Sequence, residues 1–229
     1  MNGNSTVDGV RAVELFYRPI KNTDSGRVTF LQSQTRLNSP VMGTLMPADY
    51  LPVAQLSDRC VSIFKLAFVQ LLQALGKFHE REVDVDWASV FVPARFLRQT
   101  EAPRIAADYC DKFGVKYERV CFELSPDVLD EADSTAADNV ALMRRQGFHF
   151  LLTGFGTEGF KMLKTAEFKV DNIMLDGSVA QVLGKSDRHD TCVNSLLNFV
   201  FDLNAEVIAD GITAVSYTHL RAHETGAYL

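Results

Sequence analysis

The sequence predicts an α/β protein built on one mostly parallel sheet, and three observations support this. Short apolar runs rich in β-branched and aromatic residues alternate with stretches in which apolar residues recur at helical spacing. No linker interrupts the alternation, and 229 residues suffice for one α/β barrel or two small domains. Residues 149–176 also combine a strand, a glycine-rich loop, a short helix and a second strand, which is the pattern of a right-handed βαβ unit.

The elements follow in chain order. We expect residues 1–11 to be a disordered lead-in, and residues 38–58, with several prolines, to form an ordered loop or short helical turns. The clearest amphipathic helix begins near Cys60, and Gly76 is expected to end it. The expected strands are 13–20, 27–37, 83–92, 119–124, 150–152, 173–175 and 206–209, and the other expected helices are 103–113, 136–146, 160–167 and 193–201.

Composition argues against several classes of function. The net charge of -6 is unlike the basic surface of a general nucleic-acid-binding protein. No run approaches the roughly 18 apolar residues of a membrane span, and the polar N-terminus is unlike a signal peptide. We therefore expect neither a nucleic-acid nor a membrane partner. The cysteines, which lack metal-type spacing and lie in apolar patterns, predict buried thiols and a cytoplasmic location; they are Cys60, Cys110, Cys121 and Cys192.

The glycine-rich loop after the strand at 150–152 has two interpretations. Gly154, Gly156 and Gly159 form a G-x-G-x-x-G pattern, and Asp176 lies near the later acidic position of a dinucleotide-binding fingerprint. This interpretation is the weaker one, because the helix that follows is short for such a unit and the motif lies late in the chain. The second interpretation is a family resemblance that extends over most of the sequence.

Residues 155–176, FGTEGFKMLKTAEFKVDNIMLD, resemble the Asp-Asp-Phe-Gly-Thr-Gly segment of EAL domains, bacterial phosphodiesterases that hydrolyse cyclic di-GMP. Residues 17–20 (YRPI) resemble the family's opening Tyr-Gln-Pro-Ile. Residues 47–54 (PADYLPVA) resemble its Pro-Gly-Glu-Phe-Ile-Pro-Leu-Ala, and residues 207–212 (VIADGI) its Val-Ile-Ala-Glu-Gly-Val. The matches keep order and spacing, so the resemblance implies one EAL-type (β/α) barrel domain over residues 12–213.

EAL phosphodiesterases hold two divalent metals with carboxylates and an asparagine at the strand ends, and the metals promote an in-line attack on phosphorus. This sequence departs from that pattern at most ligand positions. Gln32 stands at the signature glutamate, Phe91 at the asparagine, and Met174 at the lysine of the Lys-Ile-Asp strand. The paired aspartates are replaced by Thr153 and Gly154.

Besides Asp176, which persists in the Lys-Ile-Asp strand, three charged residues match family positions. Glu123 keeps the glutamate of the Glu-Leu-Thr-Glu motif, and Asp210 keeps a late acid on a shorter side chain. Each has an ordinary alternative, since Glu123 suits a hydrogen-bonded strand end and Asp210 before Gly211 suits a turn. Arg36 matches the family arginine that approaches the ligand phosphate, although a surface ion pair explains it equally well. We interpret the uncharged replacements and the two acids as vestigial positions: Gln32, Phe91, Glu123, Thr153, Gly154, Met174 and Asp210.

With these departures, the resemblance implies a degenerate EAL domain that is not an enzyme and holds no metal. We expect it to act in bacterial cyclic di-GMP signalling, as a protein-interaction module or as a sensor of cyclic di-GMP, with a protein partner favoured. Two alternatives stay open. One is a divergent phosphodiesterase that uses Glu123, Asp210 and Mg²⁺ or Mn²⁺. The other is dinucleotide binding at the glycine loop.

The C-terminal residues 216–229, SYTHLRAHETGAYL, have no apolar period of either kind. They resemble a sequencing-adapter read-through fused to gene models from environmental DNA. We therefore expect 214–229 to be a non-native tail and exclude it from the fold prediction. The implied barrel is then truncated, without its last helix and strand, and its first and last strands are exposed edges.

Overall fold

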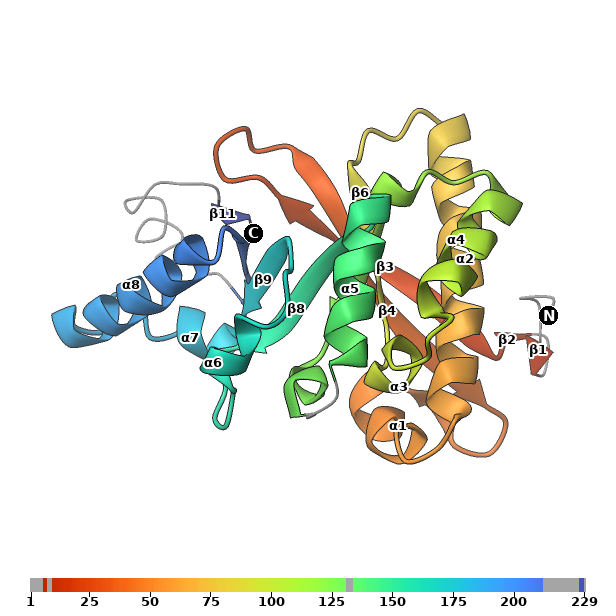
Figure 1. Ribbon diagram of the computed structural model, residues 1–229, viewed down its shortest axis with the longest axis horizontal. Coiled ribbons are helices and arrows are strands. Elements are labelled where there is room, and N and C mark those ends of the chain that lie inside the picture. Colours follow the sequence, from red (N-terminus) through yellow and green to blue (C-terminus); the bar gives the residue numbers. More distant parts are fainter. Residues whose placement is uncertain (1–5, 8–9, 131–133, 212–226, 229) are drawn as a thin grey trace.

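The computed structural model describes residues 6–7, 10–130, 134–211 and 227–228. Its main sheet has the order β11-β10-β9-β8-β7-β6-β4-β3, with β5 beside β4 (Figure 1). β3 pairs antiparallel with β4, and every later neighbour from β4–β6 to β10–β11 is parallel. The strands are β3 (Val13–Lys21), β4 (Val28–Ser39), β5 (Gly43–Leu45), β6 (Trp87–Phe91), β7 (Val120–Leu124), β8 (His149–Phe155), β9 (Asn172–Leu175), β10 (Glu206–Ala209) and β11 (Ala227–Tyr228).

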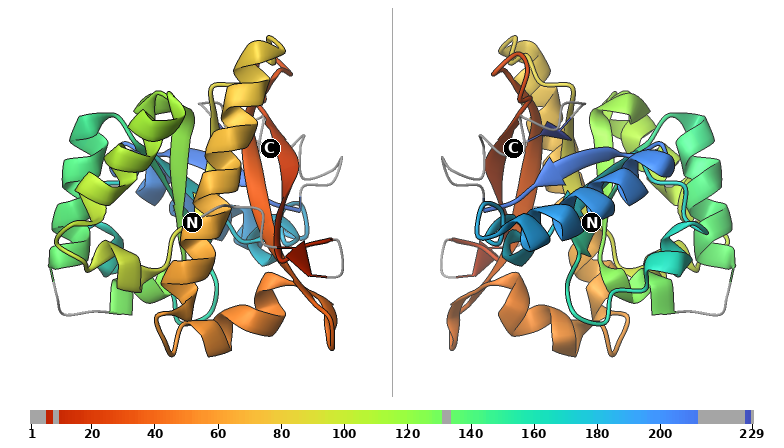
Figure 2. Two further views of the ribbon diagram at one scale, coloured as in Figure 1. Left: turned by 90° about the vertical axis from the view of Figure 1, so that its right-hand side faces the viewer. Right: turned by 90° about the vertical axis from the view of Figure 1, so that its left-hand side faces the viewer.

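Helices cover the outside of this sheet (Figures 1 and 2). The longest, α2, packs against β3 and β6 and lies beside α4, which in turn contacts α5. At the other end of the sheet, α8 packs on β10. The helices are α1 (Pro47–Ala54), α2 (Arg59–Glu80), α3 (Ala94–Leu97), α4 (Ala102–Phe113), α5 (Thr135–Gln146), α6 (Met162–Thr165), α7 (Gly177–Ala180) and α8 (Asp187–Asp202), with 3₁₀ turns η1 (Tyr117–Arg119) and η2 (Pro126–Asp130).

The sheet curls into an open α/β barrel, as predicted. Parallel strands with crossover helices bury both faces of their sheet, and here the helices cover the outer face while the curl encloses the inner one. No backbone pairing joins β3 to β10 or β11 among the described residues, so the barrel formed by these residues is open between β3 and β11. The fold therefore brings residues of β3, near the start of the chain, and residues after β10, near its end, to the two sides of one opening at the carboxyl ends of the strands, which we call the open mouth.

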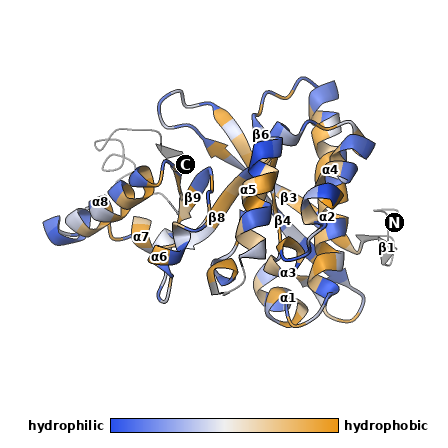
Figure 3. Cartoon of the chain, viewed as in Figure 1, coloured by the Kyte–Doolittle hydropathy of each residue, from blue (hydrophilic) through white to orange (hydrophobic). Residues whose placement is uncertain are grey.

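Side chains alternate along each strand between two apolar clusters. Outward-facing residues such as Phe122 and Phe150 join the large cluster under the helices, and Figure 3 shows hydrophilic and hydrophobic residues alternating along the helices that cover the sheet. A smaller cluster fills the inside, and we call it the barrel floor: Ile20, Phe30, Trp87, Cys121, Leu151, Met174 and Ile208. The Phe30 and Trp87 rings stack at 4.0 Å between centroids.

A polar layer lies above the barrel floor. Two residues beyond Phe30, Trp87, Cys121 and Leu151, the same strands carry Gln32, Ser89, Glu123 and Thr153, and Asp210 directly follows β10, two residues beyond Ile208. Because side chains two residues apart share a face of a strand, these polar groups point to the inside of the barrel near the carboxyl ends of the strands. That edge is where α/β sheets place functional groups.

Several expected elements differ in extent. The helix expected at 160–167 is the single turn α6, and the strand expected at 83–92 is only β6. Gly76 does not end α2, which continues to Glu80. A glycine in a helix costs only about 1 kcal/mol relative to alanine, and beyond it the Phe78 ring packs edge-on against Tyr17 at 5.7 Å. Of the four cysteines, Cys192 is exposed, because it lies on the outer face of α8.

The ends of the chain carry short strands. In the expected lead-in, β1 (Thr6–Val7) pairs antiparallel with β2 (Val10–Arg11), while residues 1–5 and 8–9 lie outside the described residues. In the expected tail, β11 pairs with β10 through Val207 and Ala227, while 212–226 and 229 lie outside the described residues. A non-native origin of 214–229 therefore stays a prediction.

By length and composition alone, α2 could cross a membrane, although no membrane span is expected from the sequence. Half of its apolar window is buried within the fold, including Phe64, Phe68, Leu71 and Leu72. A core helix passes the same test, and this helix forms the centre of the outer apolar cluster.

Candidate ligand-binding site at the strand ends

A cavity of about 620 Å³ opens above the barrel floor at the carboxyl ends of the strands. Of the seven vestigial positions and Arg36, six line this cavity, and they lie on or directly after β4, β6, β7, β8 and β10. Gly154 and Met174 do not line it. Aromatic side chains form much of the remaining wall. The lining residues are Phe16, Tyr17, Arg18, Gln32, Ser33, Gln34, Thr35, Arg36, Pro47, Tyr50, Leu51, Phe91, Glu123, Ser125, Thr153 and Asp210.

Glu123 and Gln32 form the centre of the polar layer. Ser89 Oγ donates a hydrogen bond to Glu123 Oε1, and Gln32 Nε2 donates to Glu123 Oε2 at 3.1 Å. Both carboxylate oxygens of this buried side chain are therefore satisfied. Burial raises the pKa of Glu123, while the hydrogen bonds from Ser89 and Gln32 and the charge of Arg18 act in the opposite direction.

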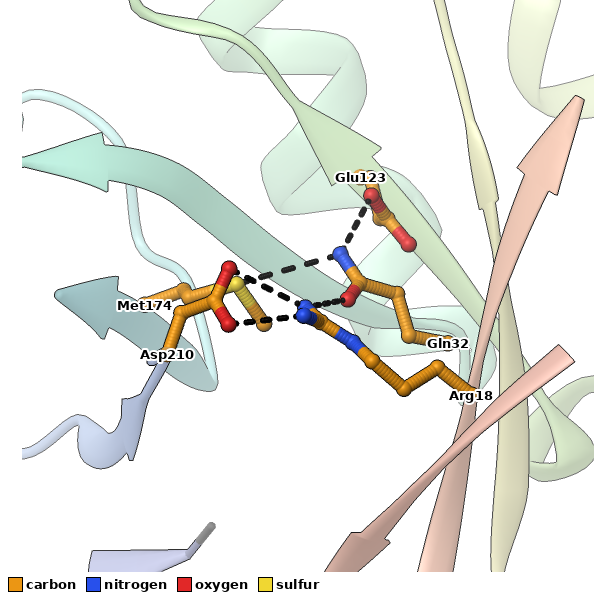
Figure 4. Close-up of polar contacts among 5 residues, drawn as sticks. All are labelled: Arg18, Gln32, Glu123, Met174 and Asp210. Atoms are coloured by element: carbon orange, nitrogen blue, oxygen red, sulfur yellow. Dashed lines mark hydrogen bonds and ion pairs between the residues drawn. The ribbon is translucent and has the colours of Figure 1, made fainter. Parts of the chain in front are cut away.

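Arg18 reaches from β3 across the open mouth to Asp210, which follows β10 (Figure 4). Its Nη1 donates to Asp210 Oδ1 at 2.7 Å and its Nη2 to Oδ2 at 3.3 Å, which is a bidentate pair. The same Nη2 also donates to Gln32 Oε1. Arg18 and Asp210 are 52% and 38% exposed, so solvent screens this ion pair and its own contribution to stability is about 0–1 kcal/mol.

Arg36 also lines the cavity, from β4, four residues beyond Gln32. Its guanidinium carbon stands 3.7 Å from the centroid of the Phe16 ring, in cation–π geometry. Its buried Nε makes no hydrogen bond, and no carboxylate pairs with the group within the described chain. The surface ion pair considered for Arg36 is therefore absent from the described residues, and Arg36 lines the cavity with no acidic partner among them.

Thr153 and Phe91 also line the cavity, but as packing groups. Thr153 Oγ1 donates to the Leu124 carbonyl at 3.1 Å, and Phe91 supplies an apolar wall. Met174 lies below, in the barrel floor, with Sδ 3.8 Å from Gln32 Nε2. Gly154 lies outside the lining residues, at a φ of +73° beside Pro126.

The glycine loop has a packing role. Gly156 has a φ of +91°, and a Cβ added there would stand 2.4 Å from Cγ2 of Val179 in α7. The loop therefore requires glycine to approach α7 closely. The following helix, α6, is a single turn, so the geometry does not supply the helix start on which a dinucleotide-binding loop depends.

The metal centre implied by the resemblance does not fit these residues. Hard divalent cations need several oxygen ligands converging on one point. Within the described residues, no group of three or more His, Cys, Asp or Glu side chains could hold a metal ion. The two acids at the cavity are already bound, Glu123 by Ser89 and Gln32, and Asp210 by Arg18. The interpretation of the altered positions as vestigial stays a prediction about their role.

Sequence reasoning missed two members of this site. Arg18 stands at the glutamine of the family's Tyr-Gln-Pro-Ile and was not expected in the site, although it bridges Asp210 and Gln32. Ser89 was not noted, although it fixes Glu123. Its signal was present in the sequence: a serine two residues after Trp87 in an otherwise apolar strand must face the same interior as Trp87.

Comparison with known proteins gives consistent matches. A family model described as "EAL domain" matches residues 9–220. An uncharacterized signaling protein of Caulobacter vibrioides is 25% identical over 205 residues, which is 86% of this chain and 24% of that protein. Cyclic di-GMP phosphodiesterase PdeR of Escherichia coli is 24% identical over 198 residues, which is 86% of this chain and 30% of that protein. The chain thus spans about a quarter to a third of the length of these relatives.

Among solved structures, the EAL enzyme Bd1971 in its cAMP- and cyclic-di-GMP-bound form has a TM-score of 0.83 and 21% identity, and the match covers 95% of this chain and 60% of that one. The names of this structure and of PdeR contradict the expectation that the chain is not an enzyme, since both are named as enzymes. That expectation came from judging ligand positions one at a time. Because the family model matches residues 9–220 and the barrel has the same fold, the chain belongs to the EAL domain family.

Proposed function

We propose that this chain acts in cyclic di-GMP signalling and binds cyclic di-GMP in the cavity at the strand ends. The observation that carries the proposal is Arg36, a guanidinium that faces a cavity of about 620 Å³ without an acidic partner among the described residues. A planar guanidinium suits the two oxygens of a phosphodiester. The choice of ligand is supported by two names: that of an E. coli relative and that of a structural neighbour both include the words cyclic di-GMP.

The wall of the cavity suits the rest of such a ligand. Four aromatic residues line it, and of these Phe16 and Phe91 offer rings outside the buried outer cluster; bases stack on such rings at about 1–3 kcal/mol each. Phe16 is 43% exposed and already carries the Arg36 guanidinium on one face. A phosphate bound at Arg36 and a base stacked on a neighbouring aromatic ring would use both the guanidinium and the aromatic wall of the cavity.

Calorimetric titration of cyclic di-GMP into the wild type and Arg36→Gln tests the proposal. Loss of a charge-assisted hydrogen bond of about 1.5–3 kcal/mol corresponds to a loss of affinity of about 10- to 100-fold. Arg104→Gln is the matched control. It removes the same positive charge, but from the outer surface of α4, where Arg104 pairs with Asp108. No binding by the wild type, or equal affinities of the two variants, would refute the proposal.

The same samples should be assayed for the linear dinucleotide with Mg²⁺ or Mn²⁺ present. The E. coli relative is named a phosphodiesterase, so product formation would assign that reaction to this chain. A mononucleotide such as cyclic GMP is the ligand control, since it offers one phosphate and one base instead of two.

A further inference from the structure

The two acids of the cavity are linked through a single cation of the chain itself. The Arg18 guanidinium binds both carboxylate oxygens of Asp210 and, through the amide of Gln32, connects to Glu123 (Figure 4). We propose that Arg18 is a built-in cation that takes the place of a divalent metal in this pocket, so that the pocket binds its ligand without added metal. The statement about the ligand rests on the proposed function; the statement about the metal does not.

The first argument is the use of the oxygen atoms. Each oxygen of Glu123 accepts one hydrogen bond, from Ser89 or Gln32, and each oxygen of Asp210 accepts one from Arg18. A divalent ion bound here would have to displace the guanidinium from Asp210 or come to rest beside it, against a like charge. Each carboxylate oxygen therefore already accepts a hydrogen bond that an incoming cation would have to displace or share.

The second argument is the orientation of Gln32. Its oxygen accepts from Arg18 Nη2, and its nitrogen donates to Glu123 Oε2. An amide is the side chain that can face a cation on one side and a carboxylate on the other, because it carries both an acceptor and a donor. A glutamate at this position would set two carboxylates about 3 Å apart, an arrangement that calls for a bridging cation or a shared proton.

The third argument is electrostatic balance. Arg18 lies close enough for its charge to favour the ionised form of buried Glu123, and it neutralises Asp210 directly. With this pairing in place, Arg36 is the cavity cation left without a carboxylate in the described part of the chain. The pocket can then attract a phosphate through Arg36, while Arg18 neutralises Asp210 and partly offsets the charge of Glu123.

Mn²⁺ titration of the protein without nucleotide, followed by electron paramagnetic resonance, tests the metal statement. The wild type is expected to show no Mn²⁺ site that depends on Glu123 or Asp210. The double variant Arg18→Gln/Gln32→Glu, which removes the guanidinium and leaves three carboxylates together, is expected to gain one. Arg104→Gln is the control for loss of a positive charge, and circular dichroism confirms that each variant is folded.

Wild-type Mn²⁺ binding that is lost in Asp210→Asn or Glu123→Gln would overturn the inference. So would a folded double variant that gains no Mn²⁺ site, because Arg18 would then not be what takes the metal's place. For the ligand, the cyclic di-GMP affinity of the wild type should agree within about twofold between EDTA and Mn²⁺, and an improvement of about tenfold or more with Mn²⁺ would contradict it. If cyclic di-GMP binds under neither condition, the proposed function fails, while the Mn²⁺ titrations still decide the role of Arg18.

Discussion

Gly156→Ala should destabilise the chain strongly, for two reasons that can be separated. A φ of +91° costs a residue with a Cβ about 1–2 kcal/mol. The added Cβ would also stand 2.4 Å from Val179 Cγ2, and relieving such overpacking costs about 1–3 kcal/mol more. We therefore expect a loss of about 2–5 kcal/mol in the free energy of unfolding, measured by urea denaturation followed by circular dichroism.

Gly159→Ala provides the control within the same loop. Gly159 also has a positive φ, +78°, but nothing lies within 4 Å of its added Cβ, so only the backbone strain of about 1–2 kcal/mol applies. In a double-mutant cycle, Val179→Ala should recover about 0.5–3 kcal/mol of the loss caused by Gly156→Ala. Equal losses at the two glycines, or no coupling to Val179, would refute the assignment of Gly156 to a packing role.

Three further predictions concern charge and thiol chemistry. Burial raises the pKa of Glu123 in the folded chain, so the free energy of unfolding of the wild type relative to Glu123→Gln should be greatest at acid pH. This difference should fall as the pH rises from the ordinary carboxyl pKa through the raised pKa of the folded chain. A difference that does not depend on pH, measured by urea denaturation, would contradict this. Arg144→Met should lower the free energy of unfolding by about 1–3 kcal/mol, because it removes the bidentate partner of half-buried Asp171, whose Oδ1 lies 2.6 Å from Arg144 Nη2. A loss no larger than that caused by Arg104→Met, at an exposed ion pair, would contradict this. One thiol, Cys192, should react rapidly with a thiol reagent in the folded chain, since burial raises the pKa of Cys110 to about 12; two or more fast thiols would contradict this.

The element order could be predicted from the sequence because the signals are local. The strand expected at 206–209 is β10 to the residue, bounded by Asn204 at a positive φ and by the Asp210-Gly211 pair. The helix at 160–167 shows the limit of such signals. Apolar residues in and just after this segment make tertiary contacts instead, since Phe160 packs on Phe155 at 5.1 Å and the following Phe168 is buried in the outer cluster.

The candidate site was only partly predictable, because its contacts join distant parts of the chain. Matching positions to a family pattern identified six lining residues, including Arg36 and Glu123. It could not show that Arg18 and Asp210, which are 192 residues apart, form an ion pair. Nor could judging ligands one at a time identify the class of protein, and the expectation that the chain is not an enzyme was contradicted by the named relatives.

The barrel floor has a consequence for spectroscopy. Trp87 is the single tryptophan of the chain, and it is buried in the floor, two residues before Ser89 on β6 and stacked on Phe30. Its fluorescence therefore reports on the inside of the barrel alone, with no second indole on the outer helices to obscure it. A ligand that settles into the cavity or a loosening of the first strands should change this emission, whereas fraying of α8 should leave it unaltered.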